Sequence, residues 1–168
     1  MLRGAISAVI TIYQNNIPLK IHFGEITTNK KIPVSENGRK FTIDNPDKKE
    51  VVKIRVDGCL IDDDRERCDY LFEVIIPEIK DEGSETKNIE TAIYVELKGS
   101  DIEKAFKQIM ATLGYLVDRH RQIDKECFIV ASRVPKASAK TQELAEKLKK
   151  SHRLAKLLIR TTQHEHKI

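Results

Sequence analysis

The apolar residues in the middle of the chain change their spacing twice, and this feature restricts the possible folds more than any other. Three segments rich in β-branched and aromatic residues come first, and each predicts a strand: residues 51–56, 69–76 and 91–98. From Ile102 to Val117 the apolar residues recur at helical spacing, and residues 127–133 again form an apolar run typical of a central strand. This order predicts an α/β fold with a mixed central β-sheet flanked by helices.

Turn-forming and cap-forming residues set the expected limits of these elements. Pro77 should end the second strand, and the polar residues 80–90 should form a loop. Ser100 and Glu103 have the spacing of a capping box, which predicts a helix start directly after the third strand. Toward the end of the chain, residues 139–150 predict a second helix and residues 155–161 a last strand. Between residues 15 and 37, prolines and glycines predict loops or short strands, and residues 5–13 could form either a strand or an amphipathic helix.

Length and composition predict one domain covering residues 1–168, with a motif core at about 51–133 and a basic segment at 136–168. The chain is 40% hydrophobic and carries a net charge of +4, which permits a polyanionic partner without requiring one. Its three cysteines form no CxxC pair, and its first apolar stretch is too short to span a bilayer. A soluble, cytoplasmic protein that does not enter the membrane is therefore expected.

Glu96 and Lys98 are charged residues in an apolar segment that ends at Gly99. Because side chains alternate along a strand, both should point to the same face. Asp69 opens the preceding predicted strand, and its carboxylate would lie beside Glu96 if the two strands are neighbours. Two carboxylates suit Mg²⁺, and a lysine supplies positive charge near a reacting phosphate. This set of residues predicts metal-assisted hydrolysis of a phosphodiester.

Asp69 together with Glu96-Leu97-Lys98, on a strand that leads straight into a helix, resembles the motif of the PD-(D/E)xK nuclease superfamily, whose members have the restriction-endonuclease-like fold. The resemblance covers about residues 51–133 and is carried by the motif and the order of elements. It implies that Asp69 and Glu96 bind Mg²⁺, with Mn²⁺ as a substitute, and that the Leu97 carbonyl is a further ligand. Lys98 would orient or activate the attacking water. Cys68 stands where the motif's name has proline.

Several other positions are relevant to the resemblance. Some members carry a glutamine and a tyrosine four apart on the helix after the motif; Gln108 matches the glutamine, but the later position is Thr112. Gln108 would then orient the substrate or the lysine, with a plain surface glutamine as the alternative. Many members also have an acid on an earlier helix, for which Glu25 and Glu36 are candidates. Asp57 either serves a second ion or begins a turn with Gly58, and the turn is favoured.

Basic side chains dominate the segment 136–168, which a nuclease could use to bind the DNA backbone. Arg119, His120 and Arg121 are expected to extend this basic surface, and an ordinary solvated helix face is the alternative. His164 and His166 lie two apart at a terminus that should fray, and surface histidines are favoured there over metal ligands.

The residues and the resemblance together predict a metal-dependent nuclease that hydrolyses phosphodiester bonds in DNA, with roles in restriction, repair or mobile-element defence left open. A homodimer is one arrangement that the family implies. The alternative function is a catalytically inactive nuclease-fold module that binds nucleic acid or a protein partner. A third possibility is an unrelated α/β protein in which the ExK triplet occurs by chance.

Overall fold

A six-stranded sheet forms the centre of the molecule, with strand order β10-β9-β8-β7-β6-β3. The computed structural model describes residues 10–14, 17–21, 24–79, 85–133 and 139–168. The bounds of the six strands are β3 (Gly24–Thr27), β6 (Glu50–Arg55), β7 (Tyr70–Ile79), β8 (Glu85–Lys98), β9 (Asp124–Ala131) and β10 (Ala155–Thr161). Strands β8, β9 and β10 run parallel to one another, and the pairs β8–β7, β7–β6 and β6–β3 are each antiparallel. The prediction of an α/β fold with a mixed sheet is confirmed.

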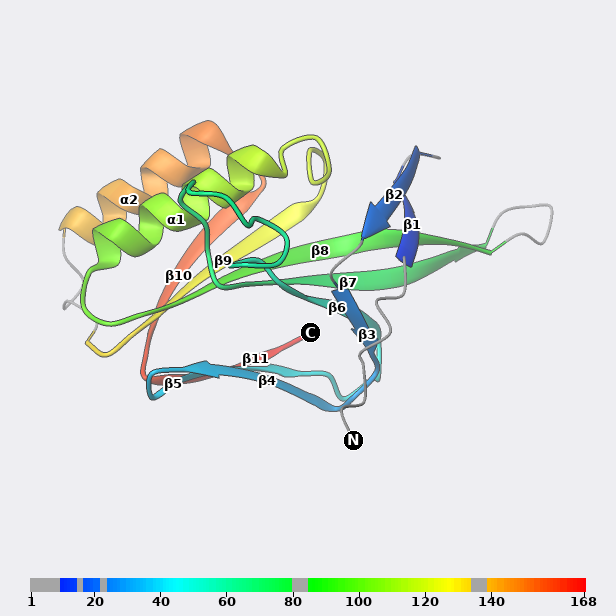
Figure 1. Ribbon diagram of the computed structural model, residues 1–168, viewed down its shortest axis with the longest axis horizontal. Helices are drawn as coiled ribbons and strands as arrows, with labels where there is room; N and C mark the ends of the chain where they lie inside the picture. Colours follow the sequence, from blue (N-terminus) through cyan, green and yellow to red (C-terminus); the bar gives the residue numbers. More distant parts are fainter. Residues whose placement is uncertain (1–9, 15–16, 22–23, 80–84, 134–138) are drawn as a thin grey trace.

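Both helices of the described chain, α1 (Ile102–Tyr115) and α2 (Ala139–Ser151), lie on one face of this sheet (Figure 1). Helix α1 connects β8 to β9 and α2 connects β9 to β10, and each strand pair is parallel. Since right-handed crossovers that step in one direction along a sheet put their helices on the same side, the two helices share a face. The expectation of helices flanking the sheet therefore holds for one face only.

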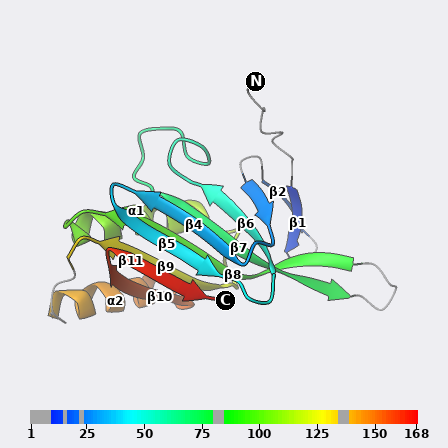
Figure 2. The same cartoon turned by 90° about the horizontal axis from the view of Figure 1, so that it is seen from below.

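A second, three-stranded sheet covers the other face (Figure 2). It has the order β11-β5-β4, with bounds β4 (Lys31–Glu36), β5 (Arg39–Asp44) and β11 (Gln163–Lys167). Strands β4 and β5 form a hairpin whose turn residues Asn37 and Gly38 both have positive φ, as a tight primed hairpin turn requires. The sequence-based expectation of a fraying terminus was wrong, because β11 pairs with β5.

A separate hairpin is formed by β1 (Ile10–Gln14) and β2 (Ile17–Ile21). It lies beside the part of β8 that extends away from the helices (Figure 1). The predicted short strands of the first quarter are thus present as β2, β3 and β4, whereas residues 1–9 lie outside the described chain.

Apolar side chains fill the space on both sides of the main sheet, as the alternation of each strand dictates. Between the sheet and the helices, the buried residues include Val52, Ile54, Leu71, Tyr94, Phe106, Ile109, Leu113 and Leu148. Between the two sheets they include Phe41, Ile43, Val51, Phe72, Ile93, Val95, Leu97 and Phe128. One face of β7 and β8 therefore packs against the helices and the other against the second sheet. A charged residue on these strands points into one layer or the other according to its place in the alternation.

Three predicted boundaries were wrong. Strand β7 continues through Pro77 to Ile79, because the β6 pairing ends at Ile75 and only β8 accompanies β7 beyond that point. Strand β8 already begins at Glu85, inside the expected loop. The N-cap of α1 is Asp101, whose side chain accepts a hydrogen bond from the Lys104 backbone N–H, so the capping box expected one residue earlier does not form.

Candidate functional site

Asp69, Glu96 and Lys98 meet where β7 begins and β8 ends. The two strands pair antiparallel with Tyr70 opposite Val95, so that Asp69 lies beside the Glu96–Leu97 segment. Alternation along β8 puts Glu96 and Lys98 on the same side as Tyr94, which packs in the layer beneath the helices. The strand neighbourhood that the site hypothesis requires is therefore present.

The Asp69 carboxylate is tied to the main chain of β8. Its Oδ2 atom accepts a hydrogen bond of 2.6 Å from the Leu97 backbone N–H. In an extended strand the N–H and C=O of one residue point to the same side, so the Leu97 carbonyl faces the same edge. Burial raises the pKa of Asp69 to about 6, although the Leu97 hydrogen bond and the Lys98 charge act to lower it.

Glu96 is the most deeply buried member of the set, with its side chain only 1% exposed. Its Oε1 lies 3.7 Å from the Lys98 ammonium nitrogen, and its buried Oε2 has no hydrogen-bond partner among the described residues. Burial raises the pKa of Glu96 to about 8, and the Asp69 charge adds to this increase while Lys98 opposes it. The positive charge that the described residues place near Glu96 is therefore too small to keep its carboxyl group ionised at neutral pH.

The donor atoms at this site are of the type that Mg²⁺ prefers. Two carboxylates and a main-chain carbonyl are hard oxygen ligands, and Mg²⁺ commonly takes one or two protein carboxylates with water and substrate oxygens. Within the described ranges, no three carboxylate, imidazole or thiol groups gather closely enough to hold a metal ion alone. An ion here would therefore use Asp69, Glu96 and the Leu97 carbonyl, and it would compensate the orphaned Glu96 oxygen.

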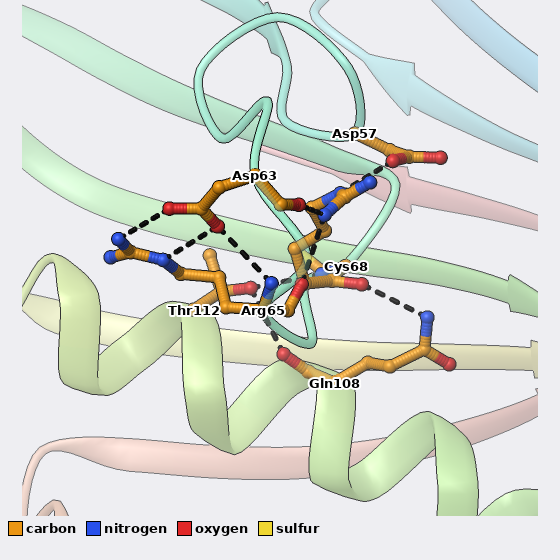
Figure 3. A network of polar contacts seen from close by, with 7 residues as sticks. Asp57, Asp63, Arg65, Cys68, Gln108 and Thr112 are labelled. Carbon is orange, nitrogen blue, oxygen red and sulfur yellow. Dashed lines mark hydrogen bonds and ion pairs between the residues drawn. The ribbon is translucent and has the colours of Figure 1, made fainter.

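Helix α1 holds the segment that leads into Asp69 (Figure 3). The Gln108 side-chain amide donates a 2.9 Å hydrogen bond to the Arg67 carbonyl, and the Cys68 backbone N–H donates one of 2.9 Å to the Thr112 hydroxyl. Gln108 is half-buried, and its Oε1 is a second buried oxygen without a described partner. Sequence reasoning missed Thr112, although a threonine on the apolar face of a helix signals a required hydrogen bond.

The loop before Asp69 is closed by ion pairs, and Asp57 is one of the partners. The Asp57 carboxylate lies 2.5 Å from the Arg67 guanidinium, and Asp63 pairs with Arg65 (Figure 3). Gly58 has φ +72° and follows Asp57 directly, which agrees with the turn interpretation of Asp57. Asp57 thus neutralises an arginine and fixes the loop.

Of the two candidate additional acids, only Glu36 lies near the site. It ends β4, and its charge contributes to the raised pKa values of both Asp69 and Glu96. Glu25 lies on the edge strand β3, opposite Lys53 and two strands away from β7. The nearby acid therefore comes from a hairpin and not from a helix.

The basic surface expected around Arg119 and His120 was wrong. Both side chains bind the fully buried Glu73: Arg119 donates through Nε and Nη2 at 2.6 and 2.7 Å, and His120 Nε2 lies 2.8 Å from Oε1. Arg121 pairs with Asp118. Arg119 and His120 are bound inside the chain because Glu73 points toward the helices and needs hydrogen-bond partners there, whereas the Arg121–Asp118 pair is exposed at the surface.

The basic C-terminal segment and its histidines are also partly engaged. Lys140 pairs with Glu103 and Glu143, while Lys136 lies outside the described residues. His164 stacks on Phe128, His166 contacts the same ring in a tilted arrangement, and His166 pairs with Glu126 at 2.6 Å. These histidines are packing residues and not an open pair of metal ligands.

Comparisons with models of protein families, with curated proteins and with solved structures found no match to this chain. Among the described helices, none has the length and apolar character needed to cross a lipid bilayer. Function must therefore be argued from the site itself.

Proposed function

We propose that the protein is a metal-dependent nuclease with a restriction-endonuclease-like fold that hydrolyses phosphodiester bonds in DNA. The observation that carries this proposal is the hydrogen bond from Leu97 N–H to the Asp69 carboxylate, which joins the two halves of the motif on neighbouring strands. The order of three antiparallel strands, a helix and a parallel strand also agrees with the resemblance to the PD-(D/E)xK nucleases.

Each residue of the site has a role that its position allows. Asp69 and Glu96 would hold Mg²⁺ or Mn²⁺ together with the Leu97 carbonyl. The bound ion would polarise the scissile phosphoryl group and lower the pKa of the attacking water. The Lys98 side chain is 27% exposed, and its ammonium nitrogen lies 3.7 Å from Glu96 Oε1. Lys98 would donate hydrogen bonds to that water or to the phosphate oxygen that gains charge. Gln108 positions Asp69 through the Arg67 carbonyl.

One observation favours the alternative of an inactive nucleic-acid-binding or protein-binding module. The Glu96 carboxyl is nearly inaccessible, and its raised pKa of about 8 keeps it largely protonated at neutral pH in the absence of a cation. Such a group binds a metal ion only if the ion's affinity exceeds the cost of deprotonation. The two functions differ in whether DNA is cut or only bound.

A cleavage assay tests the proposal. Wild-type protein is incubated with duplex, single-stranded and branched DNA and with RNA, in Mg²⁺, in Mn²⁺ and in a chelator. Cleavage is expected with either ion, and Glu96→Gln and Lys98→Ala should each reduce it by at least about 100-fold. Glu90→Gln, on the same strand but 40% exposed at its side chain, is the matched control and should keep wild-type activity.

The outcomes separate the two functions. Equal cleavage by wild type and by the Glu96 and Lys98 variants would identify a contaminating nuclease and contradict the proposal. Binding of DNA without cleavage in either ion would instead support the inactive module.

A further inference from the structure

Arg39 lies at the candidate site, although it comes from the other sheet. It begins β5 and shares the inner face of that strand with the buried residues Phe41 and Ile43, so its side chain points toward the main sheet. Its Nε and Nη2 atoms donate hydrogen bonds of 3.1 and 2.8 Å to the Ser132 hydroxyl, just after β9. A Cβ atom placed on Gly99 would be 3.8 Å from Nη2, so the guanidinium lies next to the residue that follows Lys98.

Main-chain hydrogen bonds fix the position of Arg39 relative to the site. The Ser132 N–H donates to the Gly99 carbonyl at 2.7 Å, and the Thr162 N–H donates to the Ala131 carbonyl at 2.8 Å. The Lys40 N–H in turn donates to the Thr162 carbonyl at 2.9 Å. This series of bonds links the start of β5 to the ends of β8, β9 and β10, so Arg39 is held by regular structure and not by a loose loop.

Arg39 forms no ion pair within the described chain, although the acid Glu36 is its cross-strand partner on the β4–β5 hairpin. Its hydrogen bonds there go to a neutral serine, and no described carboxylate lies within ion-pair distance of it. A guanidinium has five N–H donors, and the bonds to Ser132 use two of them. In contrast, Arg65, Arg67 and Arg119 are all paired with acids. Arg39 is therefore a half-buried, preorganised cation with donors left for an anion.

We propose that Arg39 binds a phosphate of the DNA, namely the phosphate next to the scissile one. The inference rests on the proposed nuclease function and extends it to a substrate contact made by the β4–β5 hairpin. The fork of N–H groups in arginine matches phosphate oxygens in pairs, which a lysine ammonium cannot do. The position next to Gly99 places this fork one residue beyond Lys98, at the end of β8 where the scissile phosphate would lie.

DNA binding by full-length protein tests the inference separately from cleavage. Fluorescence anisotropy with a labelled DNA that the wild type cuts would be measured over a range of salt concentrations, in a Glu96→Gln background that keeps the DNA intact. Arg39→Ala should weaken binding roughly tenfold and reduce the slope of log affinity against log salt by about 0.9, the change expected for one duplex phosphate contact. Lys40→Ala, the same charge change on the opposite face of β5, is the matched control and should leave the slope unchanged.

Two further variants distinguish a phosphate contact from a structural role. Ser132→Ala removes the same pair of hydrogen bonds but keeps the cation, so it should destabilise the fold as Arg39→Ala does while retaining most of the salt slope. Arg39→Lys should restore the slope but only part of the affinity. If Arg39→Ala and Ser132→Ala change binding equally, or if Arg39→Ala matches Lys40→Ala, the inference is overturned while cleavage by wild type still supports the nuclease. Absence of both binding and cleavage by wild type would overturn both.

Discussion

The Asp69 carboxylate and the Leu97 backbone N–H are joined by a hydrogen bond of 2.6 Å between neighbouring strands. This bond depends on the register of β7 and β8, since a slip of one residue would turn Asp69 to the opposite face of the sheet. It holds the Asp69 carboxylate at the end of β8 and restricts its rotation. The geometry of the site is thus determined by strand pairing and does not rely on a flexible loop.

Metal binding should stabilise the protein through Asp69 and Glu96. We expect Mg²⁺ at a hundredfold excess over its Kd to raise the free energy of unfolding by about 2.7 kcal/mol. Asp69→Asn, which keeps the shape of the side chain but removes its charge, should abolish this increase, whereas Asp47→Asn in an exposed turn should not. Thermal unfolding with and without Mg²⁺ measures the effect. An equal increase in the Asp69 and Asp47 variants would place the ion elsewhere.

Replacing Glu96 by glutamine should stabilise the metal-free protein while removing activity. The buried carboxyl is 1% exposed and its pKa is raised to about 8, so folding is penalised at neutral pH relative to an exposed glutamate. Glutamine avoids that penalty, and we expect a gain on the order of 1 to 3 kcal/mol. Urea unfolding in a chelator at pH 7.5 measures it. A loss of stability would show that Glu96 has a compensating partner in the fold.

Glu73 should be the acidic residue whose neutralisation costs the most stability. Burial alone would raise the pKa of Glu73, but hydrogen bonds from Arg119 and His120 outweigh burial and lower it. Glu73→Gln would leave the Arg119 guanidinium, 13% exposed, without its counter-charge, at an expected cost of about 3 to 5 kcal/mol. The matched control is Glu50→Gln, which breaks a surface pair with Lys87 and should cost no more than about 1 kcal/mol. Similar unfolding curves for the two variants would contradict this reading.

The part of the fold nearest the site could be predicted because local patterns determine it. Alternation within 51–56 and 91–98, followed by helical spacing from Ile102, identifies β6, β8 and α1, and two-residue alternation places Glu96 and Lys98 on one face. The apolar run of β9 was sufficient to predict that this strand lies inside the sheet, between two other strands.

The rest required contacts that a single sequence does not reveal. The pairing of β11 with β5 joins residues far apart in the chain, so nothing local to residues 163–167 indicates a strand. From the sequence alone, Arg119 and His120 resemble ordinary surface residues, because nothing local indicates that Glu73 faces the helices and binds them. Arg39 could not be predicted as a site residue for the same reason, because it lies near Gly99 only when the second sheet covers the first.

The stability of the protein should fall as the pH drops below about 6.5, because the pKa of His120 is lowered in the folded chain. Burial lowers the pKa of its imidazole, and this effect outweighs the opposing influence of Glu73. Below about pH 6.5 the unfolded chain therefore takes up a proton that the folded chain does not, and stability decreases with falling pH until the folded-state pKa is reached, by at most about 1.4 kcal/mol per pH unit. The neutral ring donates through Nε2 to Glu73 and accepts from the Tyr94 hydroxyl at Nδ1.

His120→Gln removes the titrating group and should flatten this part of the profile. The free energy of unfolding would be measured by urea titration from pH 5 to pH 7.5 for both proteins. Titrating groups that do not contact His120, Asp69 and Glu96 included, are common to both proteins and largely cancel in the difference between the curves. That difference should narrow as the pH falls below 6.5. Parallel curves would mean that His120 is protonated equally in the folded and unfolded states, and that the Tyr94–His120–Glu73 series does not hold a neutral ring.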